Sequence, residues 1–208
     1  MWTIAAAVVV LLILIFAEFL SRRGVHSELT RKIVHMLVGT FVAFWPFFLS
    51  WHQIQLMSAA FLATVLISLK LSIFGSIHGV NRHTMGEVLF AIVIGVLAFI
   101  VSNKYIFAVA MLHLSLADGF AAIFGLAYGE GSTYKIMGRT KSLVGSLAFF
   151  FTSLLIMIWY AAFSHNTYGA VTLIWLPLLS TVAENVSGEG TDNMVVPLLV
   201  ALVLSSAL

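Results

Sequence analysis

Long apolar runs separated by short polar breaks constrain the fold of this sequence more than any other feature. The hydrocarbon core of a bilayer is about 30 Å thick, and an α-helix needs roughly 20 apolar residues to cross it. Of the 208 residues, 62% are hydrophobic and 9% are charged, whereas about a quarter of the residues of a soluble domain are charged. These values argue against a water-soluble fold. They predict an all-α, polytopic transmembrane helix bundle, formed by a single integral membrane domain over residues 1–208.

The apolar runs predict eight membrane-spanning helices. Their expected ranges are 2–20, 33–50, 54–74, 86–102, 105–127, 143–163, 168–183 and 194–207. The last two are short and contain Pro177 and Pro197, so seven spans, with a broken or re-entrant helix near the end of the chain, is the alternative. The first run lacks a basic segment before it and is longer than the apolar part of a signal peptide. We therefore interpret it as a retained helix.

Lysine and arginine are confined almost entirely to alternate loops. With eight spans, the first, third and fifth loops hold nine of the ten basic residues, and the even-numbered loops hold only Lys104. Loops with an excess of Lys and Arg stay in the cytoplasm. The bias predicts that the odd-numbered loops are cytoplasmic and that both termini lie on the other side. Most acidic residues follow the same division, so we expect the active site at the cytoplasmic side.

One acidic side chain lies well inside a predicted span. The fifth span contains Asp118, and a carboxylate inside a bilayer is costly enough to indicate a functional role. Ser115, Ala122 and Gly125 surround it at helical spacing, which places them on roughly one helix face. Small residues let another backbone approach closely. Helix packing, with Asp118 satisfied by a partner Lys or Arg, is the alternative to a functional site.

A basic, glycine-containing loop precedes the sixth predicted span. It carries Lys135, Arg139 and Lys141 among glycines and hydroxyl residues. Glycines allow close backbone approach, the following helix N-terminus offers free N–H donors, and basic side chains supply countercharge, which together suit a polyphosphate. The spacing of a Walker A motif is absent. A basic loop is also an ordinary topology signal, so phosphate binding is one of two interpretations.

Acidic and amide side chains separate the last two apolar runs. This segment contains Glu184, Glu189, Asp192 and Asn193. Their oxygens suit hard cations such as Mg²⁺, which commonly takes one or two protein carboxylates plus substrate phosphates. A solvated acidic loop is the alternative, because acidic residues are normally exposed. The chain contains no cysteine, which excludes a thiolate metal site and a disulfide framework.

Two further charged groups lie at the predicted cytoplasmic ends of spans. Arg31, Lys32 and His35 open the second span, and Arg31 and His35 are four residues apart, so both can point the same way. Cations at a helix N-terminus oppose the macrodipole, a penalty that a bound anion would remove. A topology anchor is the alternative. Arg82 and Glu87 lie at the start of the fourth span, where an interfacial ion pair would explain them equally well.

Four segments spread over most of the chain carry a family resemblance. They are ELTRKIVHMLVG (28–39), LADGFAAIFGLAYG (116–129), GRTKSLVGSLAFF (138–150) and AENVSGEGTDNMVVPLL (183–199). Together and in this order they resemble the CTP-dependent lipid alcohol kinases: phytol kinase, dolichol kinase and the yeast-type diacylglycerol kinase. The compact length looks most like the phytol or farnesol kinase branch. The resemblance implies an enzyme that uses CTP, or sometimes UTP, with a divalent cation to phosphorylate a long-chain alcohol.

The implied reaction assigns a role to each group of residues, because phosphoryl transfer requires mostly positioning and charge neutralisation. The expected catalytic residues are Asp118, Lys141 and Asp192, with Asp118 the first choice for the carboxylate that accepts the proton of the alcohol or orients its hydroxyl group. The expected Mg²⁺ ligands are Asp118, Glu184 and Asp192. The residues expected at the nucleotide are Arg31, Lys32, Arg139, Thr140, Lys141, Ser142, Gly145, Ser146 and Asn193. The lipid alcohol, entering sideways from the inner leaflet, is placed beside His35, Ser115, Ala122 and Gly125.

Other functions would use some of the same features. A CTP-dependent lipid-phosphate cytidylyltransferase needs the same metal, nucleotide and membrane, but it releases pyrophosphate and a nucleotide-linked lipid. A nucleotide-independent lipid transporter would also keep an acid such as Asp118 inside the bundle. A noncatalytic assembly factor would not need the charged residues at all. We expect the lipid bilayer, a nucleotide and a membrane alcohol as partners, and no nucleic acid.

Overall fold

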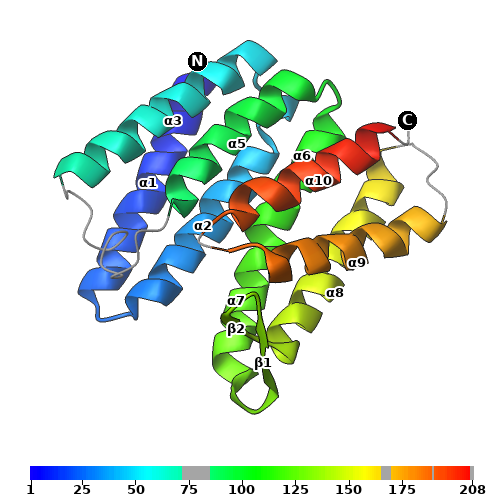
Figure 1. Ribbon diagram of the computed structural model, residues 1–208. Coiled ribbons are helices and arrows are strands. Elements are labelled where there is room, and N and C mark those ends of the chain that lie inside the picture. The colour runs from blue at the N-terminus through cyan, green and yellow to red at the C-terminus, as the bar shows by residue number, and fades with distance from the viewer. Residues whose placement is uncertain (72–84, 165–169, 189, 207–208) are drawn as a thin grey trace.

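Helices form nearly the whole of the computed structural model, which describes residues 1–71, 85–164, 170–188 and 190–206 (Figure 1). The elements are α1 (Trp2–Arg22), α2 (Ser27–Ala43), η1 (Trp45–Phe47), α3 (Trp51–Leu71), α5 (Gly86–Ile100), α6 (Lys104–Leu112), η2 (His113–Ala117), α7 (Asp118–Tyr128), η3 (Glu130–Ser132), β1 (Thr133–Ile136), β2 (Arg139–Ser142), α8 (Leu143–Phe163), α9 (Ala170–Val186) and α10 (Asp192–Ser206). The prediction of an all-α bundle is confirmed, apart from one short hairpin.

Among the described residues, three helical stretches are long and apolar enough to cross a membrane. They are Trp2–Arg22, Lys104–Tyr128 and Leu143–Phe163. Shorter apolar helices cover Gly86–Ile100, Thr172–Val186 and Asp192–Ser206. Helices of this composition place the chain at a membrane, whereas the predicted count of seven or eight spans stays a prediction. Pro177 and Pro197 lie inside α9 and α10, so neither helix ends at its proline.

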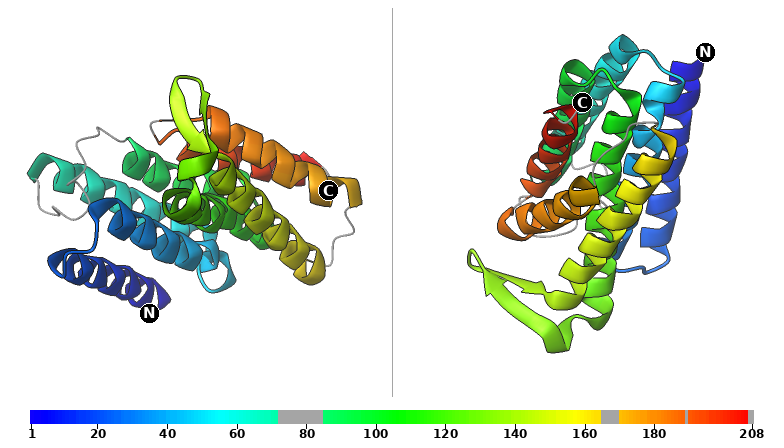
Figure 2. Two further views of the ribbon diagram at one scale, coloured as in Figure 1. Left: turned by 90° about the horizontal axis from the view of Figure 1, so that it is seen from below. Right: turned by 90° about the vertical axis from the view of Figure 1, so that its right-hand side faces the viewer.

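The core of the bundle surrounds α6. All its side chains from Ile106 to Leu112 are buried, and α2, α5, α8 and α10 pack against this helix or its continuation. In contrast, α1 lies at the edge of the bundle beside α2 (Figure 2). Its outward residues, such as Leu12 and Ile15, are exposed and apolar, as expected of a surface that faces lipid.

A π-helical segment interrupts the predicted fifth span. Residues His113–Ala117 are π-helical, and α7 begins at Asp118 directly after them. A π-turn adds one residue to the helical turn and so rotates the faces that follow it. Ser115 consequently faces α2, where a Cβ on Gly39 would lie 2.4 Å from the Ser115 Cβ, whereas Gly125 faces α8. The small residues therefore do not form the single stripe that regular helical spacing predicts.

The loop predicted between the fifth and sixth spans folds as an antiparallel hairpin, β1–β2, which the sequence analysis did not anticipate. The hairpin extends to one side from the ends of α7 and α8, toward the end of α9 (Figures 1 and 2). Its turn residues Met137 and Gly138 have φ angles of +48° and +78°. Positive φ at both central residues is the requirement of a type I′ turn, which matches the twist of two paired strands. Four-residue strands with charged side chains leave too short an apolar pattern to recognise from sequence.

Candidate active site

Three carboxylates from three different helices meet at one end of the bundle. Asp118 begins α7, Glu184 lies in the last turn of α9, and Asp192 begins α10. One oxygen from each lies within 4.8 Å of the others. The Asp118 and Glu184 residues are only 6% and 5% exposed. Like charges this close and this buried repel one another strongly, and their hard oxygen atoms suit a divalent cation such as Mg²⁺.

Two lysines are paired with this carboxylate cluster. Lys32 Nζ donates a hydrogen bond to Asp118 Oδ2 at 2.6 Å, and Lys141 Nζ donates to Glu184 Oε1. The Asp192 carboxylate accepts a hydrogen bond from the Asn193 backbone N–H at 3.1 Å. Burial raises the pKa of the Asp192 carboxyl, and the negative charge of Asp118 raises this pKa further. A cation bound between the three acids would reverse this repulsion.

A close approach of α2 to α7 brings Lys32 to the carboxylate cluster. A Cβ on Gly119, beside Asp118, would lie 2.1 Å from Met36 Cγ on α2, so only glycine allows this packing. One turn after Lys32, His35 lies with its Nε2 3.7 Å from Asp118 Oδ2 and 3.0 Å from the Leu114 carbonyl oxygen. The two side chains, three residues apart on α2, therefore reach the same carboxylate.

The turn between α9 and α10 is fixed to the start of α5. Gly190 has a φ of +84°, and a Cβ there would lie 2.4 Å from Gly86 Cα. The Asn193 side-chain Nδ2 also donates to the Gly86 carbonyl oxygen at 2.7 Å. A positive φ favours glycine, and the contact leaves no space for a side chain. These two contacts set the position of Asp192 between them.

The hairpin presents one face to the cluster and the other to solvent. Tyr134 pairs with Lys141, and Ile136 pairs with Arg139, so these four side chains share a face, because side chains alternate along a strand. They are all half-buried, whereas Thr140 on the opposite face is exposed. Of the residues predicted on β2, Arg139 and Lys141 therefore point toward the bundle and Thr140 points away from it.

Two contacts attach the hairpin to the helices that carry the acids. Tyr134 Oη donates to Asn185 Oδ1 at 2.7 Å and lies 2.6 Å from Ser146 Oγ, which donates to the same Asn185 oxygen at 3.0 Å. The Arg139 guanidinium occupies the space beside Gly188, where a Cβ would lie only 0.4 Å from Arg139 Nη1. The hairpin, α8 and the end of α9 thus form one connected wall beside Glu184.

The other residues predicted at the nucleotide have structural partners. Ser142 Oγ accepts the Gly145 backbone N–H at 3.1 Å and so caps α8. Gly145 itself packs against α7, because a Cβ there would lie 2.9 Å from the Ala121 carbonyl oxygen. Arg31 pairs with Glu28 at 2.6 Å. The structure brings Lys32 and Lys141 to the acids and Arg139 to the wall beside them. The nucleotide-binding roles of all these residues stay predictions.

Most of the residues predicted beside the lipid alcohol are packing residues in this structure. Ser115 is buried against Gly39 of α2. Gly125 packs against Ser142, because a Cβ on Gly125 would lie 3.1 Å from Ser142 Oγ. Ala122 is half-buried one turn beyond Asp118. His35 is the member of this set that contacts the carboxylate cluster. Their role in substrate binding stays a prediction. Arg82 and Glu189 lie outside the described residues.

Two residues of the candidate site were missed from the sequence. Asn185 accepts the hydrogen bonds that attach the hairpin, and Gly188 makes space for Arg139. Both belong to the segment that already contained the predicted ligands Glu184 and Asp192. A glycine in an acidic segment is a signal for close approach of another group, but the partner, an arginine on a hairpin, is visible only in three dimensions.

Comparison with known proteins finds relatives over most of the chain. It is 31% identical over 204 residues to a phytol kinase of Synechocystis sp., in an alignment that covers 92% of this chain and 84% of the relative. It is 29% identical to probable chloroplastic phytol kinases of Zea mays and Glycine max, again over 92% of this chain and over 71% and 70% of theirs. No family model and no solved structure matches.

Proposed function

This chain belongs to the phytol kinase family, and we propose that it transfers the terminal phosphate of CTP to the hydroxyl group of a long-chain isoprenoid alcohol, with phytol as the first substrate to test. The observation that carries the proposal is the meeting of Asp118, Glu184 and Asp192 within 4.8 Å, with Lys141 bound to one of them. Acids and lysines in this arrangement can bind a metal–triphosphate complex.

The three carboxylates fit Mg²⁺, because they offer hard oxygen ligands on rigid helix ends. We propose that Asp118, Glu184 and Asp192 hold the cation, which when bound neutralises charge on the nucleotide phosphates. Lys141 and Arg139, on the inner face of the hairpin, supply further positive charge to the phosphate chain. Lys32 supplies it from α2. Charge neutralisation and positioning are the main demands of phosphoryl transfer.

The proposed reaction transfers one phosphoryl group. The alcohol oxygen forms a bond to the terminal phosphorus, the bond from that phosphorus to the bridging oxygen breaks, and CDP leaves. The hydroxyl proton passes to a carboxylate, for which Asp118 is the first choice because it lies between Lys32 and His35 at the bundle interior. A carboxylate that accepts this proton acts as a general base.

The membrane arrangement is part of the proposal. We place the carboxylate cluster at the cytoplasmic face of a bundle with seven or eight spans, because nine of the ten basic residues fall in alternate loops and such loops stay in the cytoplasm. A site at this interface meets both a water-soluble nucleotide and an alcohol dissolved in the bilayer. Farnesol, geranylgeraniol, dolichol and diacylglycerol are the other acceptors to be compared with phytol.

Two labelled nucleotides test the reaction. Purified protein is incubated with phytol and CTP labelled at either the terminal or the innermost phosphate, with and without EDTA. The proposal predicts that only the terminal label enters the lipid, as a monophosphate, and that EDTA abolishes transfer. In a parallel incubation with phytyl phosphate in place of phytol, innermost label in the lipid, with release of pyrophosphate, would instead show a cytidylyltransferase. Movement of phytol across the membrane of vesicles that contain the protein, in the absence of nucleotide, would show a transporter. Competition by unlabelled UTP and ATP measures the preference for CTP.

A further inference from the structure

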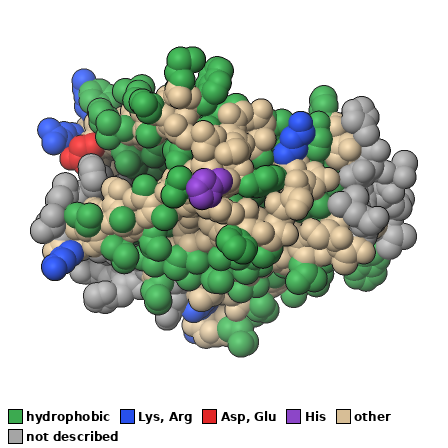
Figure 3. Space-filling view, turned by 90° about the horizontal axis from the view of Figure 1, so that it is seen from above, with side chains coloured by type: hydrophobic (Ala, Val, Ile, Leu, Met, Phe, Trp, Pro, Cys, Tyr) green, Lys and Arg blue, Asp and Glu red, His purple; other side chains and the backbone are tan. Residues whose placement is uncertain are grey.

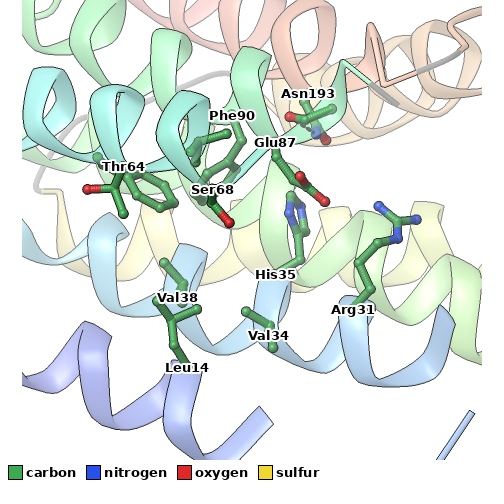
Figure 4. A pocket seen from close by; sticks show the side chains of 13 residues that line it. Leu14, Arg31, Val34, His35, Val38, Thr64, Ser68, Glu87, Phe90 and Asn193 are labelled. Atoms are coloured by element: carbon green, nitrogen blue, oxygen red, sulfur yellow. Dashed lines mark hydrogen bonds between the residues drawn. The ribbon is translucent and has the colours of Figure 1, made fainter. Parts of the chain in front are cut away.

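An apolar cavity with one charged end lies between α2, α3 and α5. Its charged end is formed by Arg31, His35, Glu87 and Asn193, as Figure 4 shows. Beyond it the lining is mainly apolar, with Val38 of α2 and Leu14 of α1 at the other end, and two hydroxyl residues of α3, Thr64 and Ser68, also line it. Arg31 and Val38 are seven residues apart on one helix, so the cavity extends about 10 Å along it.

The charged end of the cavity adjoins the carboxylate cluster. His35 belongs to both, because it lines the cavity and its Nε2 lies 3.7 Å from Asp118 Oδ2. Asn193 and Arg31 also line the cavity. Asn193 directly follows Asp192 of the cluster, and Arg31 directly precedes Lys32, which is paired with Asp118. The polar end of a molecule in this cavity would therefore be separated from Asp118, at the proposed site of phosphoryl transfer, only by the His35 side chain.

Aromatic rings continue from His35 into the apolar part. The His35 ring lies 4.9 Å from that of Phe90, measured between centroids, and Phe90 in turn lies 6.0 Å from Phe61 in an edge-on contact. Val65 completes this wall, and the Thr64 hydroxyl donates within its own helix to the Ala60 carbonyl oxygen. A nucleotide would leave its sugar and phosphate groups without partners here, at a large desolvation cost. A hydrocarbon chain has no such polar groups and would not incur this desolvation cost.

We propose that this cavity holds the first part of the hydrocarbon chain of the acceptor alcohol, with the hydroxyl group beside His35 and facing Asp118. The inference rests on the proposed kinase function and deepens it. It places the alcohol in a cavity on the other side of α2, instead of at the predicted surface of Ser115, Ala122 and Gly125. It also assigns Val38, Phe61 and Val65 as the residues that determine which chain length is bound best.

A substitution at the apolar end tests this assignment. Val65→Phe fills the cavity from a half-buried position, away from the carboxylate cluster. We expect the KM for geranylgeraniol to rise at least tenfold, whereas the KM for CTP and for dimethylallyl alcohol, which has a quarter as many carbons and does not reach the apolar end, stays within about twofold. Val8→Phe is the matched control, since Val8 is exposed on the outer side of α1, and it should change none of these values.

A photoreactive isoprenoid alcohol provides a second measurement that needs no turnover. Irradiation of the wild-type protein with this probe should label peptides of α3 and α5, and excess geranylgeraniol should prevent the labelling. An unchanged chain-length profile in Val65→Phe, or labelling confined to α7 and α8, would overturn the cavity assignment while the kinase function stands. If the wild type phosphorylates no alcohol, the proposed function is wrong, and labelling of α3 and α5 would still support the cavity as an alcohol-binding site.

Discussion

The central helical stretch, from α6 through α7, holds its charged residues in different ways at its start and in its interior. At the start, Lys104 Nζ lies over the rings of Phe47 and Tyr105, 5.0 and 5.4 Å from their centroids, and Asn103 caps the helix. In the interior, where α7 begins, Asp118 meets two more carboxylates and Lys32. Figure 3, viewed from the side opposite the hairpin, shows hydrophobic side chains interspersed with backbone and uncharged polar groups, and few charges.

The difference indicates two roles, membrane anchoring at Lys104 and the proposed reaction at the carboxylate cluster. A lysine over aromatic rings is typical of a membrane interface, where an amphipathic side chain holds the helix at a fixed depth. Lysines bound to buried carboxylates form an arrangement whose charges are kept from water and so act strongly on a bound anion or cation. We infer that Lys104 holds the central helix at the membrane interface, whereas Lys32 and Lys141 take part in the proposed reaction.

The largest effect is expected from neutralising Asp118 of the carboxylate cluster. Asp118→Asn keeps the size of the side chain but removes the metal ligand and proton acceptor, so turnover of phytol with CTP should fall about 10²–10³-fold. Lys104→Gln, at the start of the central helical stretch, should leave turnover within about twofold. Formation of labelled phytyl phosphate measures both. Equal losses in the two variants would contradict the division between anchor and site.

A second substitution compares the two faces of the hairpin. Lys141→Ala removes the partner of the buried Glu184 carboxylate and the proposed phosphate contact, so we expect the KM for CTP to rise at least tenfold. Lys135→Ala is the matched control, because Lys135 lies on the exposed face of the same hairpin. Initial rates over a range of CTP concentrations give both values. If Lys135→Ala has the larger effect, the inner face is not the nucleotide face.

A smaller effect is expected where a glycine makes space for a cation. A Cβ on Gly188 would occupy the position of the Arg139 guanidinium, so Gly188→Ala displaces that charge, and we expect the KM for CTP to rise about fivefold with little change in stability. A Cβ on Gly131, in contrast, would meet nothing within 4 Å, so Gly131→Ala should behave as the wild type. A wild-type KM in Gly188→Ala would mean that Arg139 does not contact the nucleotide.

The smallest effect concerns the attachment of the hairpin. Tyr134→Phe removes the hydrogen bonds to Ser146 and Asn185, which should lower the free energy of unfolding by about 1 kcal/mol and the melting temperature by roughly 2–4 °C. Tyr128→Phe, at a residue that is 70% exposed, should not change the melting temperature. Thermal unfolding in detergent measures both. An unchanged melting temperature in Tyr134→Phe would show that the hairpin is held by other contacts.

The helical character and the residues of the carboxylate cluster could be predicted from sequence. Apolar composition has a direct physical consequence in a bilayer, and the cost of burying Asp118 marks it as functional wherever it lies. Glu184 and Asp192 were predicted as its partners from the chemistry of their oxygens and from the family resemblance. The structure brings these three acids together.

Other features depend on long-range contacts that local patterns do not contain. The π-helical turn before Asp118 changes which face Ser115 occupies, and no residue in His113–Ala117 marks it. The hairpin turn places a non-glycine residue, Met137, at positive φ, which sequence rules assign to glycine or asparagine. The cavity beside His35 needs α3 and α5 to be placed around α2, and helix positions of this kind are set by packing rather than by periodicity.

Binding of Mn²⁺ to the purified protein in the absence of nucleotide, followed by electron paramagnetic resonance, tests most directly whether Asp118, Glu184 and Asp192 form one cation site. The account predicts that the wild type and Glu130→Gln, which changes an exposed acid outside the cluster, bind the ion alike, and that Asp192→Asn weakens its affinity at least tenfold. Wild-type affinity in a variant with all three acids replaced by their amides would contradict the account.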